Sequence, residues 1–255
     1  MTDHNGPPLD DHQYTVSGLA AYESVYGTDF VSPGGERTTR EILATLDLTD
    51  QTSVLDVGCG LGGAAFMMAR EFGSSVVAID LSQNMATEAA IRAENYELDQ
   101  LVDVVHADIM TLDGHETFDV IHSREVFLHI RDKAALHHQL MSMLTPGGVL
   151  MFTDYCRGPQ APSESFAAYM TDFGYNLCPV DHIGQLLVDT GYEQVEATDR
   201  TDEFIAIHQR ELEELSTVDL AGPKIAELKE GWQAKIERAE SGEQRWGWFR
   251  AVKPH

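Results

Sequence analysis

The chain has 255 residues, 43% of them apolar, and its 42 acidic and 17 basic residues give a formal net charge of −25. A charge of this sign repels nucleic-acid phosphates and anionic lipid surfaces, which excludes polyanions as the expected partners. No run approaches the roughly 18 apolar residues of a membrane helix, and the opening MTDHNGPPLDDH lacks the basic and apolar segments of a signal peptide. We therefore expect a cytoplasmic protein that acts on a small molecule and binds neither nucleic acid nor membranes, with monomer and homodimer both open.

The first fifty residues carry two helical patterns on either side of a turn. Aromatic and apolar residues at near-helical spacing predict one helix over about 16–26, and the run REILATL predicts a second that ends near Asp47. Between them, the sequence SPGG over 32–35 is typical of a turn.

From residue 52 onward, short β-branched runs alternate with longer helical patterns. The predicted strands cover 53–57, 75–80, 102–108, 118–124, 147–155, 193–199 and 245–253, the last as an edge strand. The predicted helices cover 61–72, 82–97, 132–144 and much of 160–190 and 202–240. Alternation of this kind indicates a parallel sheet that is covered on both faces and joined by right-handed crossovers.

The sequence therefore predicts an α/β fold with a Rossmann-like, doubly wound, mostly parallel seven-stranded sheet, N-terminal helices and a helical substrate cap. We divide the chain into three parts. Residues 1–50 form a lid over the site, 51–157 form the cofactor-binding core, and 158–255 add the substrate-binding helices and the last strands.

A glycine-rich turn follows the first predicted strand, in the run VLDVGCGLGG over 54–63. Glycines let the backbone approach a ligand closely, and the N-terminus of the next helix offers free N–H donors. Such a loop can bind NAD, a flavin or S-adenosylmethionine (SAM). It can also be a tight turn with a structural role only.

Three acids at three consecutive strand ends narrow this choice. Asp56 stands two residues before the first glycine, where a carboxylate would crowd a pyrophosphate but would suit the positively charged SAM. Asp80 ends the second strand, twenty residues after Gly60, which is the spacing at which a carboxylate reaches ribose hydroxyls. Asp108 ends the third strand on the same edge. The charges favour SAM over a dinucleotide.

These motifs, VLDVGCGLGG, AID and HAD, resemble those of the class I SAM-dependent methyltransferases. The resemblance implies that Gly58 and Gly60 approach the methionine part of SAM, Asp80 the ribose, and Asp108 the adenine amino group. It also implies a set of further cofactor-binding residues: Asp56, Leu81, Ile109 and Arg124.

Segments outside this common core resemble the phosphoethanolamine N-methyltransferases, which methylate phosphoethanolamine three times to give phosphocholine. The matching segments are Gln13-Tyr14-Thr15, Tyr22-Glu23, Val31-Ser32, Ser123-Arg124, Leu128-His129, Thr153-Asp154-Tyr155-Cys156 and Gln244-Arg245-Trp246-Gly247. The resemblance implies that the acceptor pocket is lined by Tyr14, His129, Tyr155, Tyr175 and Lys235. It also implies that Tyr22, Val31 and Ser32 close over SAM.

Two positions depart from that family. Glu125 stands where the family has Asp. An acidic group is thus kept near the amine, on a longer side chain. Phe173 stands where the family has a phosphate-binding Arg, and a benzyl group replaces neither the charge nor the paired donors of a guanidinium. We therefore expect an acceptor other than phosphoethanolamine, such as glycine, sarcosine or dimethylglycine, in contact with Phe173.

The chemistry needs a base, because an aliphatic amine with a pKa of about 10 is almost wholly protonated at neutral pH. We expect His129 to accept that proton, Tyr14 to act as a latch beside it, and Glu125 to orient the ammonium. The expected cofactor is SAM, which leaves as S-adenosylhomocysteine, without a metal. The alternatives are S-methylation of a small thioether or thiol, a SAM-binding protein without catalysis, and an NAD-dependent oxidoreductase.

Overall fold

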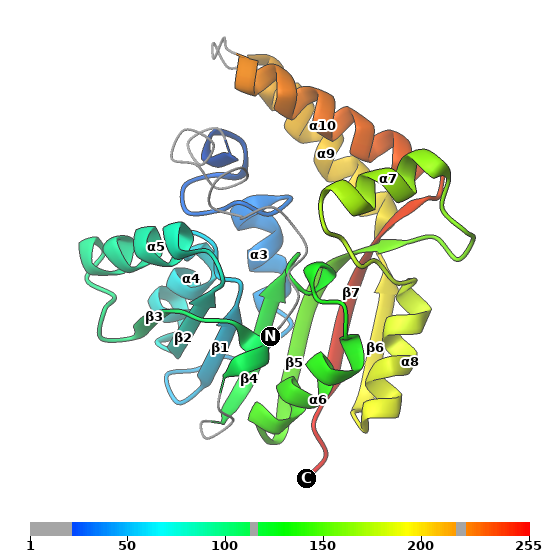
Figure 1. Ribbon diagram of the computed structural model, residues 1–255. Helices are drawn as coiled ribbons and strands as arrows, with labels where there is room; N and C mark the ends of the chain where they lie inside the picture. Colours follow the sequence, from blue (N-terminus) through cyan, green and yellow to red (C-terminus); the bar gives the residue numbers. More distant parts are fainter. Residues whose placement is uncertain (1–21, 113–116, 218–222) are drawn as a thin grey trace.

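The computed structural model describes residues 22–112, 117–217 and 223–255, and shows one seven-stranded sheet between two layers of helices (Figure 1). The strand order is β3-β2-β1-β4-β5-β7-β6. The strands are β1 Ser53–Val57, β2 Ser75–Asp80, β3 Val102–His106, β4 Phe118–Arg124, β5 Leu144–Arg157, β6 Glu193–Asp199 and β7 Gln244–Val252. The predicted fold class is confirmed.

The prediction that the last strand lies at an edge was wrong. β7 pairs antiparallel with both β5 and β6, so it lies inside the sheet and β6 forms the edge. The burial of the two strands gives the reason. Trp246 and Phe249 of β7 are fully buried, whereas no residue of β6 is. The more apolar strand therefore takes the inner position.

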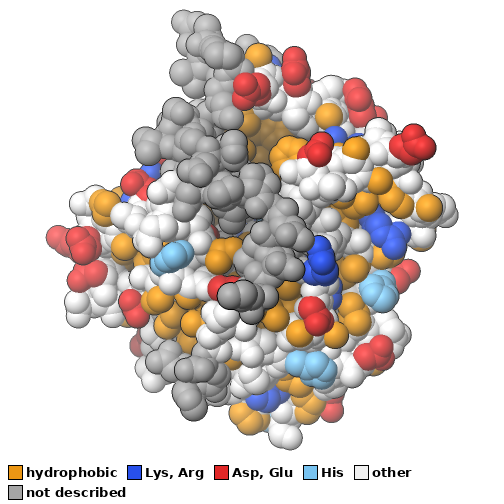
Figure 2. All heavy atoms as spheres, viewed as in Figure 1, with side chains coloured by type: hydrophobic (Ala, Val, Ile, Leu, Met, Phe, Trp, Pro, Cys, Tyr) orange, Lys and Arg blue, Asp and Glu red, His pale blue; other side chains and the backbone are white. Residues whose placement is uncertain are grey.

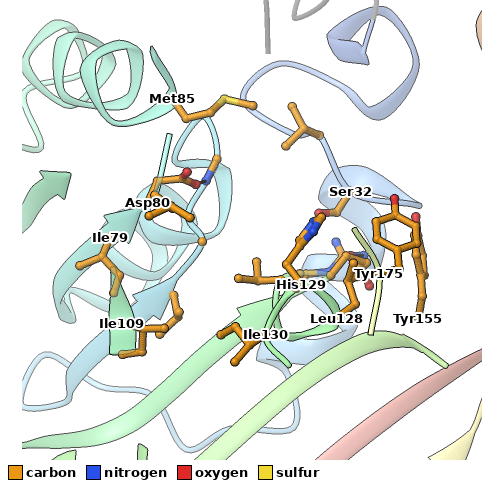
Figure 3. Close-up of a pocket in the computed structure, with 18 of the residues that line it drawn as sticks. Ser32, Ile79, Asp80, Met85, Ile109, Leu128, His129, Ile130, Tyr155 and Tyr175 are labelled. Atoms are coloured by element: carbon orange, nitrogen blue, oxygen red, sulfur yellow. Dashed lines mark hydrogen bonds and ion pairs between the residues drawn. The ribbon is translucent and has the colours of Figure 1, made fainter. Parts of the chain in front are cut away.

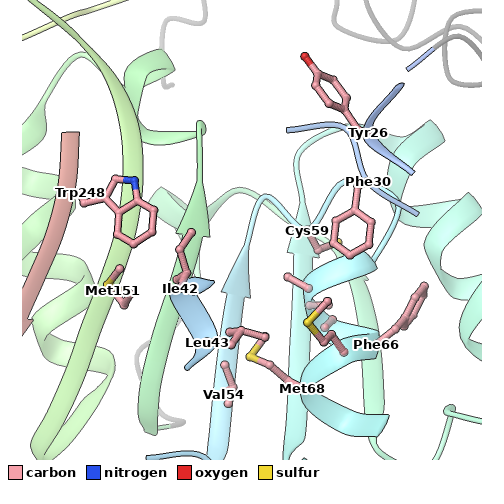
Figure 4. Packing of buried hydrophobic residues seen from close by; sticks show 14 of the residues in the cluster. Tyr26, Phe30, Ile42, Leu43, Val54, Cys59, Phe66, Met68, Met151 and Trp248 are labelled. Carbon is pink, nitrogen blue, oxygen red and sulfur yellow. The ribbon is translucent and has the colours of Figure 1, made fainter. Parts of the chain in front are cut away.

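Successive residues along each strand point to opposite faces of the sheet, and a separate hydrophobic core lies on each face. Val54 packs with helices α3 Gly35–Leu43, α4 Gly63–Phe72 and α5 Gln83–Asn95 (Figure 4). Its neighbour Leu55 packs with α6 Lys133–Met143 and α8 Val180–Thr190 on the opposite face. This two-residue period is what the β-branched runs of the sequence predicted.

Helix starts follow from local side chains. Ser82, Asp132 and Ser163 cap α5, α6 and α7 (Glu164–Asp172) by accepting hydrogen bonds from backbone N–H groups three residues on. Such caps satisfy donors that the first helical turn cannot. The predicted helical stretch 160–190 is thereby divided into α7 and α8.

The helices α9 Thr201–Thr217 and α10 Pro223–Glu240 pack together beyond the carboxyl ends of the parallel strands (Figure 1). They match the predicted amphipathic helices of 202–240. Of the predicted first helix, residues 22–26 are helical and the earlier part lies outside the described residues.

Acidic side chains are spread over the visible face of the molecule rather than gathered in one patch (Figure 2). This distribution fits a solvated acidic surface, as the spacing of acids along the chain predicted. Within the described ranges, no helix has the length and apolar character needed to cross a bilayer.

Candidate active site

A cavity opens at the carboxyl ends of β1, β2 and β4, beneath the N-terminal segment and α10 (Figure 3). Its void is about 1180 Å³ when the space at the open mouth is included. The predicted site residues that line it are Tyr22, Val31, Ser32, Gly58, Gly60, Asp80, Leu81, Asp108, Ile109, Arg124, Glu125, His129, Tyr155, Tyr175 and Lys235. These residues are far apart in sequence, and the fold brings them together.

The glycine loop forms one wall of this cavity because its backbone takes conformations that other residues avoid. Gly58 and Gly60 have φ of 72° and 57°. A Cβ on Gly58 would lie 2.1 Å from the Val126 side chain. Glycine at this position is therefore a steric requirement, and the loop can come within contact distance of a ligand.

Asp80 is fixed at the end of β2 by the loop itself. Its Oδ2 accepts a hydrogen bond from the Gly60 N–H at 2.9 Å, and its Oδ1 accepts one from the Ser82 N–H at 2.8 Å. Asp108 caps the short 3-10 helix Ile109–Thr111, where its Oδ1 accepts from the Met110 N–H at 2.9 Å. Both carboxylates thus stand in set orientations on one side of the cavity.

Asp56 lies below the cavity rather than in its wall. Its Oδ1 accepts a hydrogen bond from His122 Nδ1 at 2.7 Å, and both side chains are buried. Asp56 instead borders a smaller pocket next to Gly58 and Arg124. The prediction that Asp56 binds the cofactor therefore stays a prediction.

Arg124 lines the cavity, but its guanidinium is directed at the N-terminal turn. It donates to the Pro33 carbonyl at 2.6 Å and to Thr39 Oγ1 at 2.9 Å. These contacts hold the turn that carries Val31 and Ser32 against the cavity. No sequence pattern predicts this role of Arg124.

Glu125 follows Arg124 in a left-handed backbone conformation, with φ of 55°. Its Oε1 accepts hydrogen bonds from Thr153 Oγ1 at 2.7 Å and Trp246 Nε1 at 2.9 Å. Two neutral donors fix Oε1, and the other oxygen, Oε2, lies 3.6 Å from the Arg124 guanidinium, which compensates part of the negative charge. The side chain lines the cavity, where the remaining negative charge can attract a cation.

The other end of the cavity is aromatic and carries one lysine (Figure 3). The rings of His129 and Tyr175 lie 5.3 Å apart, edge to face. Lys235 Nζ donates to the Tyr155 hydroxyl at 3.1 Å. Burial lowers the pKa of Lys235 to about 8, partly opposed by the charge of Glu211. This end offers a histidine nitrogen, ring faces and an ammonium to a ligand.

Of the predicted acceptor residues that the structure describes, Phe173 is not among those that line the cavity. Tyr14 lies outside the described residues. Phe173 is 48% exposed, and its ring packs on Tyr169 and Tyr175 at centroid distances of 4.8 and 5.6 Å. The Arg238 guanidinium lies 3.9 Å from the centre of the Tyr169 ring. A guanidinium is therefore present in the aromatic cluster that contains Phe173, supplied by α10.

Several cavity residues were not predicted from the sequence: Tyr26, Pro33, Val57, Ile79, Met85, Ala107, Val126, Leu128 and Ile130. Tyr26 stands four residues after Tyr22, so helical spacing alone places it on the same face. The others are ordinary apolar residues, and only the fold shows that they border a cavity.

Residues 48–218 match the family described as "Methyltransferase domain", over about two thirds of the chain. The chain belongs to the methyltransferase-domain family. The match begins just before β1 and contains the glycine loop, Asp80, Asp108 and His129. The resemblance to class I methyltransferases is confirmed.

Among known proteins, this chain is 43% identical to a phosphoethanolamine N-methyltransferase of Triticum aestivum, over 96% of the chain and 50% of the relative. It is 29% identical to the Plasmodium falciparum protein of that name, over 96% and 95% of the two chains. It thus spans about half the length of the plant relative.

Among solved structures, this chain resembles Haemonchus contortus phosphoethanolamine N-methyltransferase 2 in complex with phosphomonomethylethanolamine and S-adenosylhomocysteine. The TM-score is 0.91 and the identity 32%, over 97% of this chain and 59% of the other. The closer resemblance read from the sequence is confirmed at the level of both sequence and fold.

Proposed function

We propose that this protein is a SAM-dependent N-methyltransferase whose acceptor is a small amine with an anionic end, namely phosphoethanolamine or its N-methylated forms. One observation carries the proposal. A single cavity joins the acid-bearing strand ends of Asp80 and Asp108 to the end that holds His129, Tyr155 and Lys235. The relatives that span nearly all of this chain support the same acceptor class.

The acid-bearing end of the cavity fits SAM. The Asp80 carboxylate is suited to ribose hydroxyls, Asp108 to the adenine amino group, and the backbone at Gly58 and Gly60 to the methionine part. When bound, SAM supplies an electrophilic methyl group on a sulfonium. Tyr22, Val31 and Ser32 exclude water on the N-terminal side, which favours displacement at the methyl group over side reactions.

The acceptor end prepares the amine. An ammonium has no lone pair, so His129 accepts its proton, while the charge of Glu125 holds the nitrogen in place. Tyr14, which lies outside the described residues, is the proposed latch beside His129. The ring faces of Tyr155 and Tyr175 stabilise the cation that grows more methylated.

The anionic end of the acceptor contacts Lys235. The guanidinium of Arg238 lies nearby, against the ring of Tyr169. This second cation changes the expectation that was based on Phe173 alone. A phosphate beside the Lys235 ammonium would also have the Arg238 guanidinium about one helical turn further along α10. For this reason phosphobases take first place as acceptors.

A second candidate is an amine that bears a carboxylate, such as glycine, sarcosine or dimethylglycine. The exposed apolar ring of Phe173 favours it, since a carboxylate carries less charge than a phosphate and depends less on a guanidinium fork.

The proposed function is tested by incubating the protein with SAM and phosphoethanolamine and identifying the products by mass spectrometry. We expect N-methylated phosphobases and S-adenosylhomocysteine. His129→Ala and Tyr14→Phe should lower turnover by about tenfold or more while SAM binding changes little, because deprotonation and closure are not needed to hold the cofactor. Undiminished turnover in His129→Ala would leave this residue with a structural role only.

A further inference from the structure

The turn that carries His129 is held by two buried ionisable residues, Lys133 and Asp154. The turn is the 3-10 helix Phe127–His129 with Ile130 after it. Figure 3 shows Leu128, His129 and Ile130 along one side of the cavity. Lys133 is 6% exposed and Asp154 is 1% exposed.

Lys133 forms hydrogen bonds with the backbone at both ends of the turn. Its Nζ donates to the Phe127 carbonyl at 2.6 Å and to the Ile130 carbonyl at 2.7 Å. Nearer the middle of the turn, the Asp154 carboxyl accepts a hydrogen bond from the Leu128 N–H. Two side chains, one from α6 and one from β5, thus hold the peptide group between Phe127 and Leu128 and the one that follows Ile130.

The remaining polar groups of the turn are also satisfied. The Asn176 N–H donates to the Leu128 carbonyl at 2.7 Å, and Asn176 Nδ2 donates to the His129 carbonyl at 3.2 Å. The His129 N–H donates to the Val126 carbonyl at 3.1 Å. The backbone around His129 is therefore fixed at each donor and acceptor, which limits the positions that the imidazole can take.

Burial of Lys133 and Asp154 is unfavourable in free energy. Lys133 is the first residue of α6, where the helix dipole disfavours a cation, and its ammonium is also removed from water. Burial lowers the pKa of Lys133 and raises the pKa of Asp154 to about 8, and in each case the charge of the other residue opposes the shift. Apolar side chains in their place would often be as stable or more stable. Stability alone therefore does not explain the pair.

We propose that Lys133 and Asp154 are positioning residues that hold His129 where it meets the acceptor amine. The inference rests on the proposed function, because that function gives His129 its role. The geometry of the turn is observed and does not depend on the proposed function. Neither residue lines the cavity, so both act through the turn.

The first test replaces Lys133 by Met, which fills similar volume and donates no hydrogen bond. We expect kcat for the amine acceptor to fall by about tenfold or more, with the KM for SAM within about twofold of the wild-type value. The melting temperature should fall, because this single change leaves the Ile130 carbonyl without its donor and Asp154 without the neighbouring cation, so kcat is compared at a temperature at which both proteins are folded. His138→Gln, on the exposed side of the same helix, is the matched control and should keep wild-type kcat.

The second test uses Asp154. Asp154→Asn keeps an oxygen that can accept the Leu128 N–H, whereas Asp154→Leu does not. We expect kcat of Asp154→Asn to exceed that of Asp154→Leu by about fivefold or more at similar KM for SAM. Equal kcat in the two variants, or wild-type kcat in Lys133→Met, would overturn the proposal.

The third measurement does not depend on turnover. The imidazole NMR signal of His129, assigned with His129→Ala, should shift or broaden in Lys133→Met and stay in place in His138→Gln. An unmoved signal in Lys133→Met would overturn the positioning role. If the wild-type protein methylated no amine, the proposed function would fail, and this signal would still decide whether Lys133 positions His129.

Discussion

Glu211 on α9 accepts a hydrogen bond from the backbone N–H of Gly34, 2.7 Å away and 177 positions earlier in the chain. On the other side of the same turn, Arg124 donates to the Pro33 carbonyl. One acidic and one basic side chain thus hold the two sides of a single peptide group, the one between Pro33 and Gly34, in the segment that borders the cofactor end. Helix α9 is thereby linked to this N-terminal segment.

Glu211 is 2% exposed, and burial raises its pKa to about 7 from the ordinary 4.5. Between these two values the folded state holds a proton that the unfolded state has lost. The stabilisation is therefore complete below about pH 4.5 and is lost as the pH rises toward 7. The shift corresponds to about 3 kcal/mol.

We predict that Glu211→Gln raises the free energy of unfolding at pH 8 by about 1–3 kcal/mol relative to the wild type, because the amide still accepts the Gly34 N–H without a buried charge. The difference should vanish near pH 5. Urea unfolding at both pH values measures it, with Glu213→Gln on the exposed part of α9 as the control. A variant that is less stable than the wild type at pH 8 would show that the Glu211 charge stabilises the fold.

A second prediction concerns Asp80. SAM should bind with an affinity of about −8 kcal/mol, and Asp80→Ala should weaken it by about tenfold or more. The variant loses the proposed ribose partner and also the two hydrogen bonds that fix Gly60 and Ser82. Asp80→Asn should fall between the two. Calorimetry measures this, with the exposed Asp103→Ala on β3 as the control, and equal affinity in Asp80→Ala and wild type would refute the assignment.

A third prediction follows from Lys235, whose pKa is lowered to about 8 by burial. Above that pH the side chain loses its charge, so the KM for an anionic acceptor should rise from about pH 8 upward while the KM for SAM stays level. Lys235→Met should have a high acceptor KM with little of this pH dependence. A KM profile that is the same in wild type and variant would place the anionic end of the acceptor elsewhere.

Local sequence patterns predicted β1, β2 and β4 closely, because each is a short run rich in β-branched residues that is largely buried between the helix layers. The same patterns failed to predict the order of β7 and β6 at the edge of the sheet. Whether β7 or β6 lies outside depends on which strand buries more apolar surface against the whole sheet, and Trp246 and Phe249 decide this only once both helix layers are in place.

The cofactor end was likewise predictable, since Gly58, Gly60 and Asp80 lie within one strand–turn–helix unit and its neighbour. The supports of the acceptor end were not. Glu211 stands among other glutamates in a charged helix, and nothing local distinguishes it from Glu213. Lys133 reads as a solvated residue at a helix start. Their roles come from contacts between distant segments, which a local pattern does not contain.

The most direct measurement compares acceptors. Purified protein with SAM is supplied separately with phosphoethanolamine, its mono- and dimethyl forms, glycine, sarcosine, dimethylglycine and a small thioether, and S-adenosylhomocysteine release gives kcat/KM for each. We expect at least one phosphobase to exceed every carboxylate-bearing amine and the thioether by about tenfold or more, because a dianion gains more than a carboxylate from Lys235 and Arg238. Highest kcat/KM for glycine or sarcosine, or no release with any phosphobase, would contradict phosphobase N-methylation.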